Sequence, residues 1–597
     1  MNMLLRNITI DELARIFARH ADRSPVPFLS DAASLRQARR LAKKNGLWDD
    51  ITDNFDPASD IPVIRRSDFR QYQRVGDRVR PQQVDAERLG DLLLAAHALW
   101  LEHPKADVEY LQDLLWSYCD NYTWVRAAHE GCSIDLGSGK LATLFAEILQ
   151  ILGDRIEEEV AVRLRSEIDR RIFQNYWNQH HTHDFWKTVR MNWNHVCNGC
   201  LIRTALMELE DPRELALMTH AAIQNLTYAL DGFSDDGGCE EGPGYWGFGF
   251  GHYLYVAHAL HSKTDGEINI MTNPKVERIC RYPLAAYIDG KHRSTFADSG
   301  HGYIPSRVAI TVNEFHDLPE LYDFCPLHED GTLQLEIEDH SLMHDLAIYN
   351  NAKAPQKPDD RDYILEDLGQ VKLRGRSDHK QMTVMAIAGH NGVPHNHNDI
   401  GSFIVHRGSR IHLVDPGGPK YRKDTFGPKR YEIPYCSSYG HSLPVINGRL
   451  QQTGSQHHGV LSTENLNGEG NKQIVIDMTK AYPRGTVKRL VRTFILDPTS
   501  NTLVLQDDYT FTKPPSSIEE AFITFDKAII AKDGQSVRIG TKQNGLTVEP
   551  VDIDGRFEIE RLEEAAKTDG KNDEVITRIT FTLASLSKQM LLRFRIS

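Results

Sequence analysis

Hydrophobic positions in the first part of the chain recur every three to four residues. Over residues 85–103, Leu89, Leu92 and Ala96 fall on one face of a helix. Pro212 suits the first turn of a later helix, because its missing N–H is not needed there. The same spacing predicts further amphipathic helices over 107–118, 139–152, 156–173 and 212–230.

The loops between these helices are rich in aromatic and polar residues. They lie at 118–130, 175–186 and 231–253 and contain Trp, Tyr, Asn, His and Arg. Aromatic faces stack on sugar rings, and polar groups orient the sugar. Helical hairpins with such loops predict a helical toroid whose loops line a sugar-binding cleft.

After about residue 350 the pattern changes to short, β-branched segments with a period of two residues. Turn-forming clusters such as RGSR at 407–410 and INGR at 446–449 separate them. This pattern is typical of an antiparallel β-sandwich. The expected strands are 380–389, 401–408, 410–415, 472–478, 486–496, 502–511 and 589–596.

Length and charge limit the classes of function. A chain of 597 residues exceeds one ordinary core, so at least two domains are expected. The net charge of -14 argues against a general nucleic-acid binder, which would carry a basic face, but it permits a basic cleft for a polyanionic substrate. No run of about eighteen apolar residues occurs, so no membrane span is predicted.

The cysteines and the N-terminus point to an ordinary globular protein. Eight cysteines are too few for a disulfide scaffold at this length. Cys197 and Cys200 form a single CxxC, for which two thiols on a helix are favoured over a zinc site. The first twenty residues lack the apolar core of a signal peptide. A cytoplasmic protein is expected, or a periplasmic or secreted one from which a leader was removed.

The segment 394–418 concentrates groups that bind metals or exchange protons. It places His395, His397 and Asp399 within five residues. Residues i and i+2 of an extended segment point the same way, so His-x-His with a later Asp is a metal-ligand pattern. A polar loop that holds two histidines is the alternative.

Two later residues extend this pattern. Asp415 ends the strand-like run that follows His-x-His, and His441 precedes another such run. His397, Asp415 and His441 together would suit zinc, with water as a fourth ligand. Alone, His441 would more often be a structural loop residue.

The segment 191–199 groups Asn192, Asn194 and His195 around Trp193 at the start of an apolar helix. Helix capping is the alternative for either asparagine. Asparagine donates hydrogen bonds without adding charge, which suits it to holding a sugar carboxylate.

The segment 239–246 presents Tyr245 and Trp246 on a Gly-Pro-Gly turn that follows two glutamates. A glycoside hydrolase needs two carboxylates, one with a raised pKa. A solvated acidic loop is the favoured reading for most of the acidic residues in this region. They are Asp235, Asp236, Glu240 and Glu241.

These motifs resemble those of the heparinase II/III-like polysaccharide lyases. The resembling stretches are NWNHVCNG, the DGGCEEGPGYW loop, HNHNDIGSF with the later LVDPGG, and GHSLPVING. They extend from about Tyr118 to Gly448, and the helical half precedes the sandwich as it does in the family. Relatives often show Asn followed by His where this chain has Asn192 and Trp193, so the resemblance leaves open which of the two asparagines is the working residue.

The resemblance implies a multidomain α+β chain. An N-terminal (α/α) toroid over 1–350 and a connector over 351–370 would precede an antiparallel β-sandwich over 371–597, with the active site between the two domains. The reaction would be β-elimination on a uronic acid within an anionic polysaccharide, without nucleic acid or membrane as a partner. Glycosaminoglycans such as heparan sulfate, chondroitin sulfate or hyaluronan are the first expectation, and alginate is the alternative.

The resemblance also implies roles for residues. Asn192 or Asn194, with His195, would hold the uronate carboxylate and stabilise the enolate-like charge. Tyr245 and His395 are the candidates for acid and base: Tyr245 could serve as both when the two groups lie on one side of the sugar ring, and His395 would be the base for the other epimer. A phenol has a pKa near 10, so Tyr245 would need a cationic or hydrogen-bonding neighbour to act as a base. The further candidates for substrate contact or catalysis are Arg126, His129, Trp193, Glu241, Trp246 and Tyr421.

For the metal, the resemblance implies one divalent ion, with zinc in first place. His397, Asp415 and His441 would hold it in a structural role and so fix the loop that carries His395. For Arg126, a solvated surface arginine is the alternative to a substrate contact.

Three other classes compete with the lyase. A hydrolase on the same toroid would use Glu241 with Asp235 or Asp236. A carbohydrate-binding protein would hold oligosaccharide without cleaving it. A metallohydrolase of the amidohydrolase type also uses His-x-His, but it places that motif early, on the first strand of an α/β barrel.

Overall fold

The computed structural model describes residues 8–25, 32–178, 184–334, 336, 352, 354–376 and 380–597. The chain forms two compact units, each built from three stretches of sequence. The helical unit comprises Met1–Gly232, Trp246–Glu277 and Ile304–Gln356. The β unit comprises Phe233–Tyr245, Arg278–Tyr303 and Lys357–Ser597. Residues 179–183 of the aromatic loop at 175–186, and residues 351 and 353 of the connector, lie outside the described residues.

This division differs from the predicted boundaries, because two segments before residue 350 belong to the β unit. These segments are hydrogen-bonded to the rest of the β unit. For example, Lys372 Nζ donates to the Tyr287 carbonyl at 2.7 Å. Part of the expected connector is also sheet, since β3 (Tyr363–Leu365) pairs with β4 (Gln370–Arg374). Hydrophobic periodicity is a local signal and does not report which distant segment a loop joins.

The five predicted helices form, with ends shifted by a few residues. They are α7 (Val79–Trp100), α8 (Val108–Cys119), α9 (Leu136–Leu152), α10 (Glu158–Ile168) and α13 (Pro212–Leu230). The last begins with Pro212, and the Asp211 side chain caps it by accepting from the N–H groups of Arg213 and Glu214. The predicted continuation of α10 to residue 173 is a π-helical turn, Asp169–Phe173.

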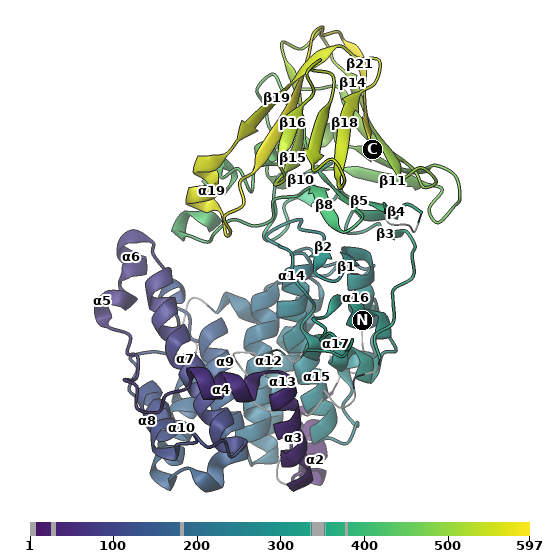
Figure 1. Ribbon diagram of the computed structural model, residues 1–597. Coiled ribbons are helices and arrows are strands. Elements are labelled where there is room, and N and C mark those ends of the chain that lie inside the picture. Colours follow the sequence, from purple (N-terminus) through teal and green to yellow (C-terminus); the bar gives the residue numbers. More distant parts are fainter. Residues whose placement is uncertain are drawn as a thin grey trace. The chain divides into compact units, whose positions relative to one another are not determined.

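The helical unit is organised around α12 (Asn192–Glu208), which is buried along most of its length. It packs against α9, α13 and α15 (Gly251–Lys263), and these helices lie side by side in Figure 1. Cys197 and Cys200 are buried on α12 with their thiols reduced, and Cys200 Sγ lies 3.6 Å from His252 Nδ1. The other α-helices described in this unit are α2 (Ile10–Arg19), α3 (Ala32–Lys44), α4 (Leu47–Asn54), α5 (Arg66–Phe69), α6 (Gln71–Val75), α11 (Gln174–Trp177) and α17 (Ser306–Phe315).

None of the helices in the described part of the chain combines the length and the apolar character that crossing a bilayer requires.

The β unit contains three larger antiparallel sheets. The first has the order β3-β4-β5-β7-β8, with β5 (Met382–Ile387), β7 (Phe403–Arg407) and β8 (Arg410–Leu413). The second has the order β11-β12-β13-β14-β21-β18-β17-β16, and the third β19-β20-β15-β9. Their strands are β9 (Val445–Ile446), β11 (Val460–Glu464), β12 (Lys472–Asp477), β13 (Arg489–Asp497), β14 (Thr502–Thr510), β15 (Ile518–Thr524), β16 (Ala528–Ile530), β17 (Val537–Gly540), β18 (Gly545–Pro550), β19 (Gly555–Arg561), β20 (Thr577–Leu583) and β21 (Gln589–Ile596).

One hydrophobic core joins the three sheets. Val384 of the first sheet, Phe494 of the second and Phe522 of the third belong to the same buried cluster. Burial alternates strictly along β14, as the two-residue period predicts for a strand with one buried face. All seven predicted strands form, in this antiparallel arrangement.

Two two-stranded sheets, α14 (Pro243–Tyr245), the end of α16 (Pro274–Ala286) and α19 (Glu563–Asp569) are the remaining α-helices and strands described in this unit. The segment Arg278–Tyr303 contains the hairpin of β1 (Tyr287–Asp289) and β2 (His292–Arg293). It also takes in the last part of α16, while Phe233–Tyr245 ends with α14. The second two-stranded sheet pairs β6 (His390–Asn391) with β10 (Gly454–His458), which follow one another only after three intervening strands.

Candidate active site

Asp298 lies at the centre of a buried cluster in the β unit. Its Oδ2 accepts hydrogen bonds from His395 Nδ1 at 2.8 Å and from the Tyr421 hydroxyl at 3.0 Å. Its Oδ1 lies 2.8 Å from Arg430 Nη2 and 3.1 Å from His397 Nε2. Burial by itself raises the pKa of this carboxyl, but hydrogen bonds from the two histidines and the charge of Arg430 bring it well below its ordinary value. The carboxylate is therefore ionised and orients both histidines.

Two glycines of the LVDPGG motif allow the loop with Asp298 to come close. A Cβ on Gly418 would lie 2.7 Å from Asp298 Cα, and one on Gly417 would lie 2.4 Å from the Ser299 carbonyl oxygen. Gly417 also has a φ of +69°. Ala297, next to Asp298, has a φ of +59°, which is uncommon for a residue other than glycine. Close backbone packing thus explains these glycines.

Tyr245 and His395 form a stacked pair. Their ring centroids lie 4.4 Å apart with an interplanar angle of 25°. The Tyr245 hydroxyl lies 2.6 Å from the Tyr421 hydroxyl, which is 3.3 Å from His395 Nδ1. Burial raises the pKa of Tyr245 well above its ordinary value. The hydrogen bond with Tyr421 lowers this pKa, and the negative charges of Asp298 and Glu241 raise it again. The phenol therefore keeps its proton near neutral pH and is suited to donating it.

The backbone of His395 is strained, and its ring lies between two carboxylates. Its φ is +58°, a conformation that is costly for a side chain of this size and is often found at functional sites. Nδ1 donates to Asp298, so Nε2 is the nitrogen that can exchange a proton, and it lies 3.3 Å from Glu241 Oε1. Glu241 is buried, so the solvated loop favoured from the sequence is wrong for this residue.

The other acidic residues of this loop have different surroundings. Asp236 Oδ1 accepts from the Ser234 hydroxyl at 2.5 Å and from the Gly238 N–H at 3.0 Å. Its Oδ2 accepts from the Asp367 N–H at 2.8 Å. Asp235 is exposed. Both carboxylate oxygens of Asp236 therefore stabilise the loop. This argues against Asp236 as the second catalytic carboxylate that a hydrolase would need beside Glu241.

His397, Asp399 and His441 form a second buried cluster, in which one possible ligand atom from each lies within 4.8 Å of the others. Asp415 joins it, with Oδ2 2.9 Å from His441 Nδ1. His397 Nδ1 and Asp399 Oδ2 are buried and have no hydrogen-bond partner among the described residues. Unpaired buried polar atoms are costly, and a cation would relieve both. The structure thus brings the three predicted ligands together and adds Asp399.

The contacts of His397 are those of a metal-binding histidine. Such a histidine commonly donates its second ring nitrogen to a carboxylate, and His397 does so to Asp298. Burial lowers the pKa of His397 despite this bond, so the ring is neutral near pH 7. Asp298 therefore links the possible metal cluster to His395.

Arg492 ties together the two loops that carry this cluster. Its Nη1 donates to the Gly401 carbonyl at 2.9 Å and to the Ser442 carbonyl at 2.6 Å. Gly401 follows Asp399 closely, and Ser442 follows His441. The guanidinium is fully buried and is balanced by Asp507, 2.6 Å from Nη2. The sandwich core thus positions the loops of the cluster.

The two asparagines of NWNH differ in their contacts within the helical unit. The Asn194 amide nitrogen donates to the carbonyls of Lys187, Val189 and Asn225, at 2.9 to 3.2 Å. Asn192 is the first residue of α12, after the N-cap residue Met191, so capping is not its role. The side chain of Asn194 is therefore committed to holding loops in place.

Two other predicted residues lie in the core of the helical unit. His195 is buried beside the rings of Phe250 and Tyr253, and burial lowers its pKa to about 3, so it is neutral. Trp246 has no exposed surface, so the predicted sugar contact is wrong and its ring packs in the core. Sequence position alone does not tell which side of a loop faces inward.

Arg126, His129 and Trp193 come together in the helical unit around Asp135. Asp135 Oδ2 accepts from His129 Nδ1 at 2.7 Å and from the Arg126 N–H at 3.1 Å. The Trp193 ring packs edge-on against His129, with centroids 4.6 Å apart. The structure therefore groups these three predicted substrate contacts, as it groups Tyr421 with Tyr245 and His395 in the β unit.

No family model and no curated protein sequence matches this chain. Solved structures do match it. A crystal structure of heparinase III aligns over 97% of this chain and 93% of its own, with a TM-score of 0.61 and 12% identity. A heparan sulfate lyase from Pedobacter heparinus aligns over 98% and 88%, with a TM-score of 0.58 and 13% identity. This chain has the heparinase III fold. The predicted helical toroid followed by a β-sandwich is thereby confirmed.

Within the heparinase III fold of this chain, sequence reasoning missed Asp298 and Arg430. Asp298 stands in FADSG, which has no metal-ligand or catalytic spacing. Arg430 stands beside Lys429 in GPKRYE, in a region with several other basic residues, and no spacing marks it as a partner of Asp298. Only the contact with His395 and His397 gives Asp298 its role, so no local signal identifies it.

Replacing Asp298 with Asn is expected to lower catalytic activity at least about a hundredfold, since an amide holds the His395 imidazolium and Arg430 less strongly than a carboxylate does. The loss of one partner of a buried ion pair should also destabilise the fold, by about 3 kcal/mol. Activity, metal content and thermal unfolding of the variant are the measurements. Unchanged activity would rule out Asp298 as the residue that positions His395.

Proposed function

We propose that this protein is a polysaccharide lyase that cleaves a uronic-acid-containing anionic polysaccharide, with glycosaminoglycans as the first candidates. The observation that carries the proposal is the stacked pair of Tyr245 and His395, joined through Tyr421 and Asp298, on the heparinase III fold. Heparinase III and heparan sulfate lyase are the names of the matching structures. Alginate remains the alternative substrate.

In the proposed reaction Tyr245 is the acid and His395 the base. β-Elimination removes the proton on C5 of the uronate and breaks the bond from C4 to its oxygen, which leaves a C4–C5 double bond. His395 Nε2 takes the C5 proton, and Asp298 stabilises the resulting imidazolium through Nδ1. Tyr245, whose pKa is raised by burial, gives its proton to the departing oxygen. A protonated phenol and a histidine oriented by a carboxylate support this division of roles.

The uronate carboxylate must be neutralised before C5 can lose its proton. Of the two asparagines, Asn192 is the better candidate, because the Asn194 amide is occupied by three carbonyls. His195 is neutral and buried, so it supports packing near Asn192 rather than supplying a charge.

We also propose that the cluster of His397, Asp399, Asp415 and His441 holds one divalent cation, with zinc preferred. Imidazole and carboxylate donors suit zinc. The unpaired His397 Nδ1 and Asp399 Oδ2 fit such an ion, and a cation near His441 Nδ1 would replace the proton shared with Asp415. The ion would hold these loops together, and the proton transfers would remain with Tyr245 and His395.

The deciding experiment is digestion of a panel of defined uronate polymers. Ultraviolet absorbance and the concentration of reducing ends are measured during each digestion. A lyase creates a conjugated unsaturated uronate, so absorbance should rise in proportion to the reducing ends. Reducing ends without absorbance would replace the lyase with a hydrolase. Binding without either product would indicate a carbohydrate-binding protein.

A further inference from the structure

A second group of possible metal ligands lies in the β unit and shares no residue with the cluster around His397. Asp289, His292 and His406 each offer one ligand atom, and these atoms lie within 4.8 Å of one another. Asp289 and His292 belong to the β1–β2 hairpin, and His406 belongs to β7 of the first sheet. None of the three residues has a part in the proposed reaction.

The hairpin is held against the first sheet by a hydrogen bond and by apolar packing. Arg374 Nη1 on β4 donates to the Ile288 carbonyl at 3.1 Å, and its Nε is ion-paired with Asp360 at 2.5 Å. Ile288 also packs with Ile404 of β7 in one buried cluster. Side chains two residues apart on a strand share a face, so His406 lies on the same face as Ile404. Sheet and hairpin thus bring the three residues together.

Asp289 lies between the two histidines. Its Oδ1 is 2.6 Å from His292 Nδ1, and its Oδ2 is 3.3 Å from His406 Nε2. The ring centroids of the two histidines are 5.3 Å apart. Two imidazole nitrogens and one carboxylate therefore converge on a small volume. An ion bound there would replace the proton that His292 and Asp289 share.

His406 has a buried nitrogen without a hydrogen bond. The residue is 3% exposed, and its Nε2 makes no hydrogen bond of acceptable geometry among the described residues, although Asp289 is near. A buried polar atom without such a partner is costly. A metal ion bound to this nitrogen would remove that cost.

The opposite side of the group is open to solvent. The side chains of Asp289 and His292 are 48% and 23% exposed, whereas those of His397 and His441 are fully buried. An ion could therefore reach Asp289 and His292 from solution without opening the fold. Water could complete its coordination, as it commonly does where a protein supplies three ligands.

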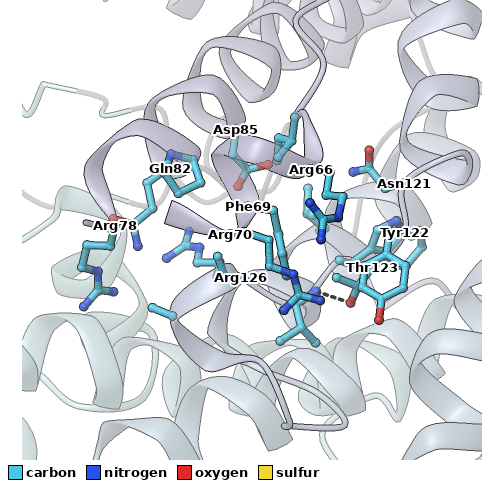
Figure 2. A pocket seen from close by; sticks show the side chains of 17 residues that line it. Arg66, Phe69, Arg70, Arg78, Gln82, Asp85, Asn121, Tyr122, Thr123 and Arg126 are labelled. Carbon is cyan, nitrogen blue, oxygen red and sulfur yellow. Dashed lines mark hydrogen bonds between the residues drawn. The ribbon is translucent and has the colours of Figure 1, made fainter. Parts of the chain in front are cut away.

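An arginine-lined cavity in the helical unit has the opposite chemistry. It has a volume of about 410 Å³ and one carboxylate, Asp85, in its lining. No histidine or cysteine is among the described residues that line it. Its arginines, which Figure 2 shows, are Arg66, Arg70, Arg78 and Arg126. Metal ions are repelled by this charge, so the cavity does not compete with the site of the β unit in a metal titration.

We propose that Asp289, His292 and His406 bind a divalent transition-metal ion such as zinc, which fastens the β1–β2 hairpin to the first sheet. Two imidazole nitrogens and a carboxylate suit zinc better than calcium, which prefers oxygen ligands. The site is separate from the proposed metal cluster around His397. It is also independent of the proposed lyase activity, because none of its residues transfers a proton there.

The test measures zinc binding by the full chain, through calorimetric titration and through metal analysis after dialysis at a buffered zinc concentration. His292→Ala removes one ligand, and Asp289→Asn keeps the shape of the side chain but lacks its charge. Each variant should bind one zinc ion fewer than the parent. Affinity at this site should fall at least about a hundredfold, because a lost ligand costs at least as much as a lost hydrogen bond to a ligand.

The matched control is His457→Ala. His457 is a partly exposed histidine of the same unit, and its Nδ1 lies 2.9 Å from the Lys480 carbonyl. The control should bind as much zinc as the parent. Added zinc should also raise the melting temperature more in the parent and the control than in the two site variants, because an ion held jointly by hairpin and sheet binds only the folded chain.

Metal analysis of His397→Ala separates this site from the other metal cluster. His397→Ala should keep the zinc bound by Asp289, His292 and His406, whether or not the His397 cluster holds an ion. Equal zinc binding by the parent, His292→Ala and Asp289→Asn overturns the inference. An equal loss from the His457 control also overturns it, because that result would indicate unspecific binding by surface histidines.

Discussion

Replacing Tyr245 with Phe is expected to lower kcat for β-elimination by about a thousandfold, within the range for loss of a general acid. The change removes only the hydroxyl, which lies 2.6 Å from that of Tyr421. The ring remains to stack on His395 at 4.4 Å. Folding stability should therefore change by no more than about 1 kcal/mol, the contribution of one hydrogen bond. Initial rates and thermal unfolding are the measurements.

The matched control is Tyr363→Phe. Tyr363 is a tyrosine of the same unit whose hydroxyl accepts one hydrogen bond from Arg361 at 3.1 Å. It lies outside the Tyr245 cluster, so its removal should leave kcat within about twofold, well below the change that loss of an acid produces. Full activity of Tyr245→Phe would show that another group protonates the leaving oxygen. Similar losses in both variants would point to a general effect of losing hydroxyls in this unit.

Replacing His397 with Ala is expected to remove the bound metal and to lower the free energy of unfolding by about 3 kcal/mol or more. His397 is 1% exposed and connects Asp298 to the cluster of possible metal ligands. Its loss would leave the loops of Asp399 and His441 without the ion proposed to hold them together. Metal analysis after dialysis, thermal unfolding and activity are the measurements.

The matched control is His395→Asn. Asparagine tolerates the positive φ of this position better than alanine does, so the backbone can be kept. The variant should lose activity and keep both its metal content and its melting temperature, because His395 is the proposed base and not a proposed metal ligand. An equal loss of metal from the two variants would contradict the separation of the metal cluster from the proton-transfer pair.

Local patterns in the sequence determined the elements of this fold and the stretches that hold its chemistry. The period of β14 and the apolar face of α7 are set by neighbouring residues, so the sequence shows them directly. His-x-His and the EEGPGYW turn also place their groups a few residues apart. The sequence therefore marks these stretches as candidate sites, and the roles given to Tyr245 and His395 come from the resemblance to the heparinase II/III-like lyases.

Only the tertiary structure decided which of these groups meet. Asp298 gains its role because Gly417 and Gly418, more than a hundred residues later, let another loop approach its backbone. Glu241 and Trp246 are separated by a short turn, yet Glu241 lies beside His395 while Trp246 is buried in the helical core. Such contacts depend on long-range packing, which cannot be predicted from the spacing of residues along the chain.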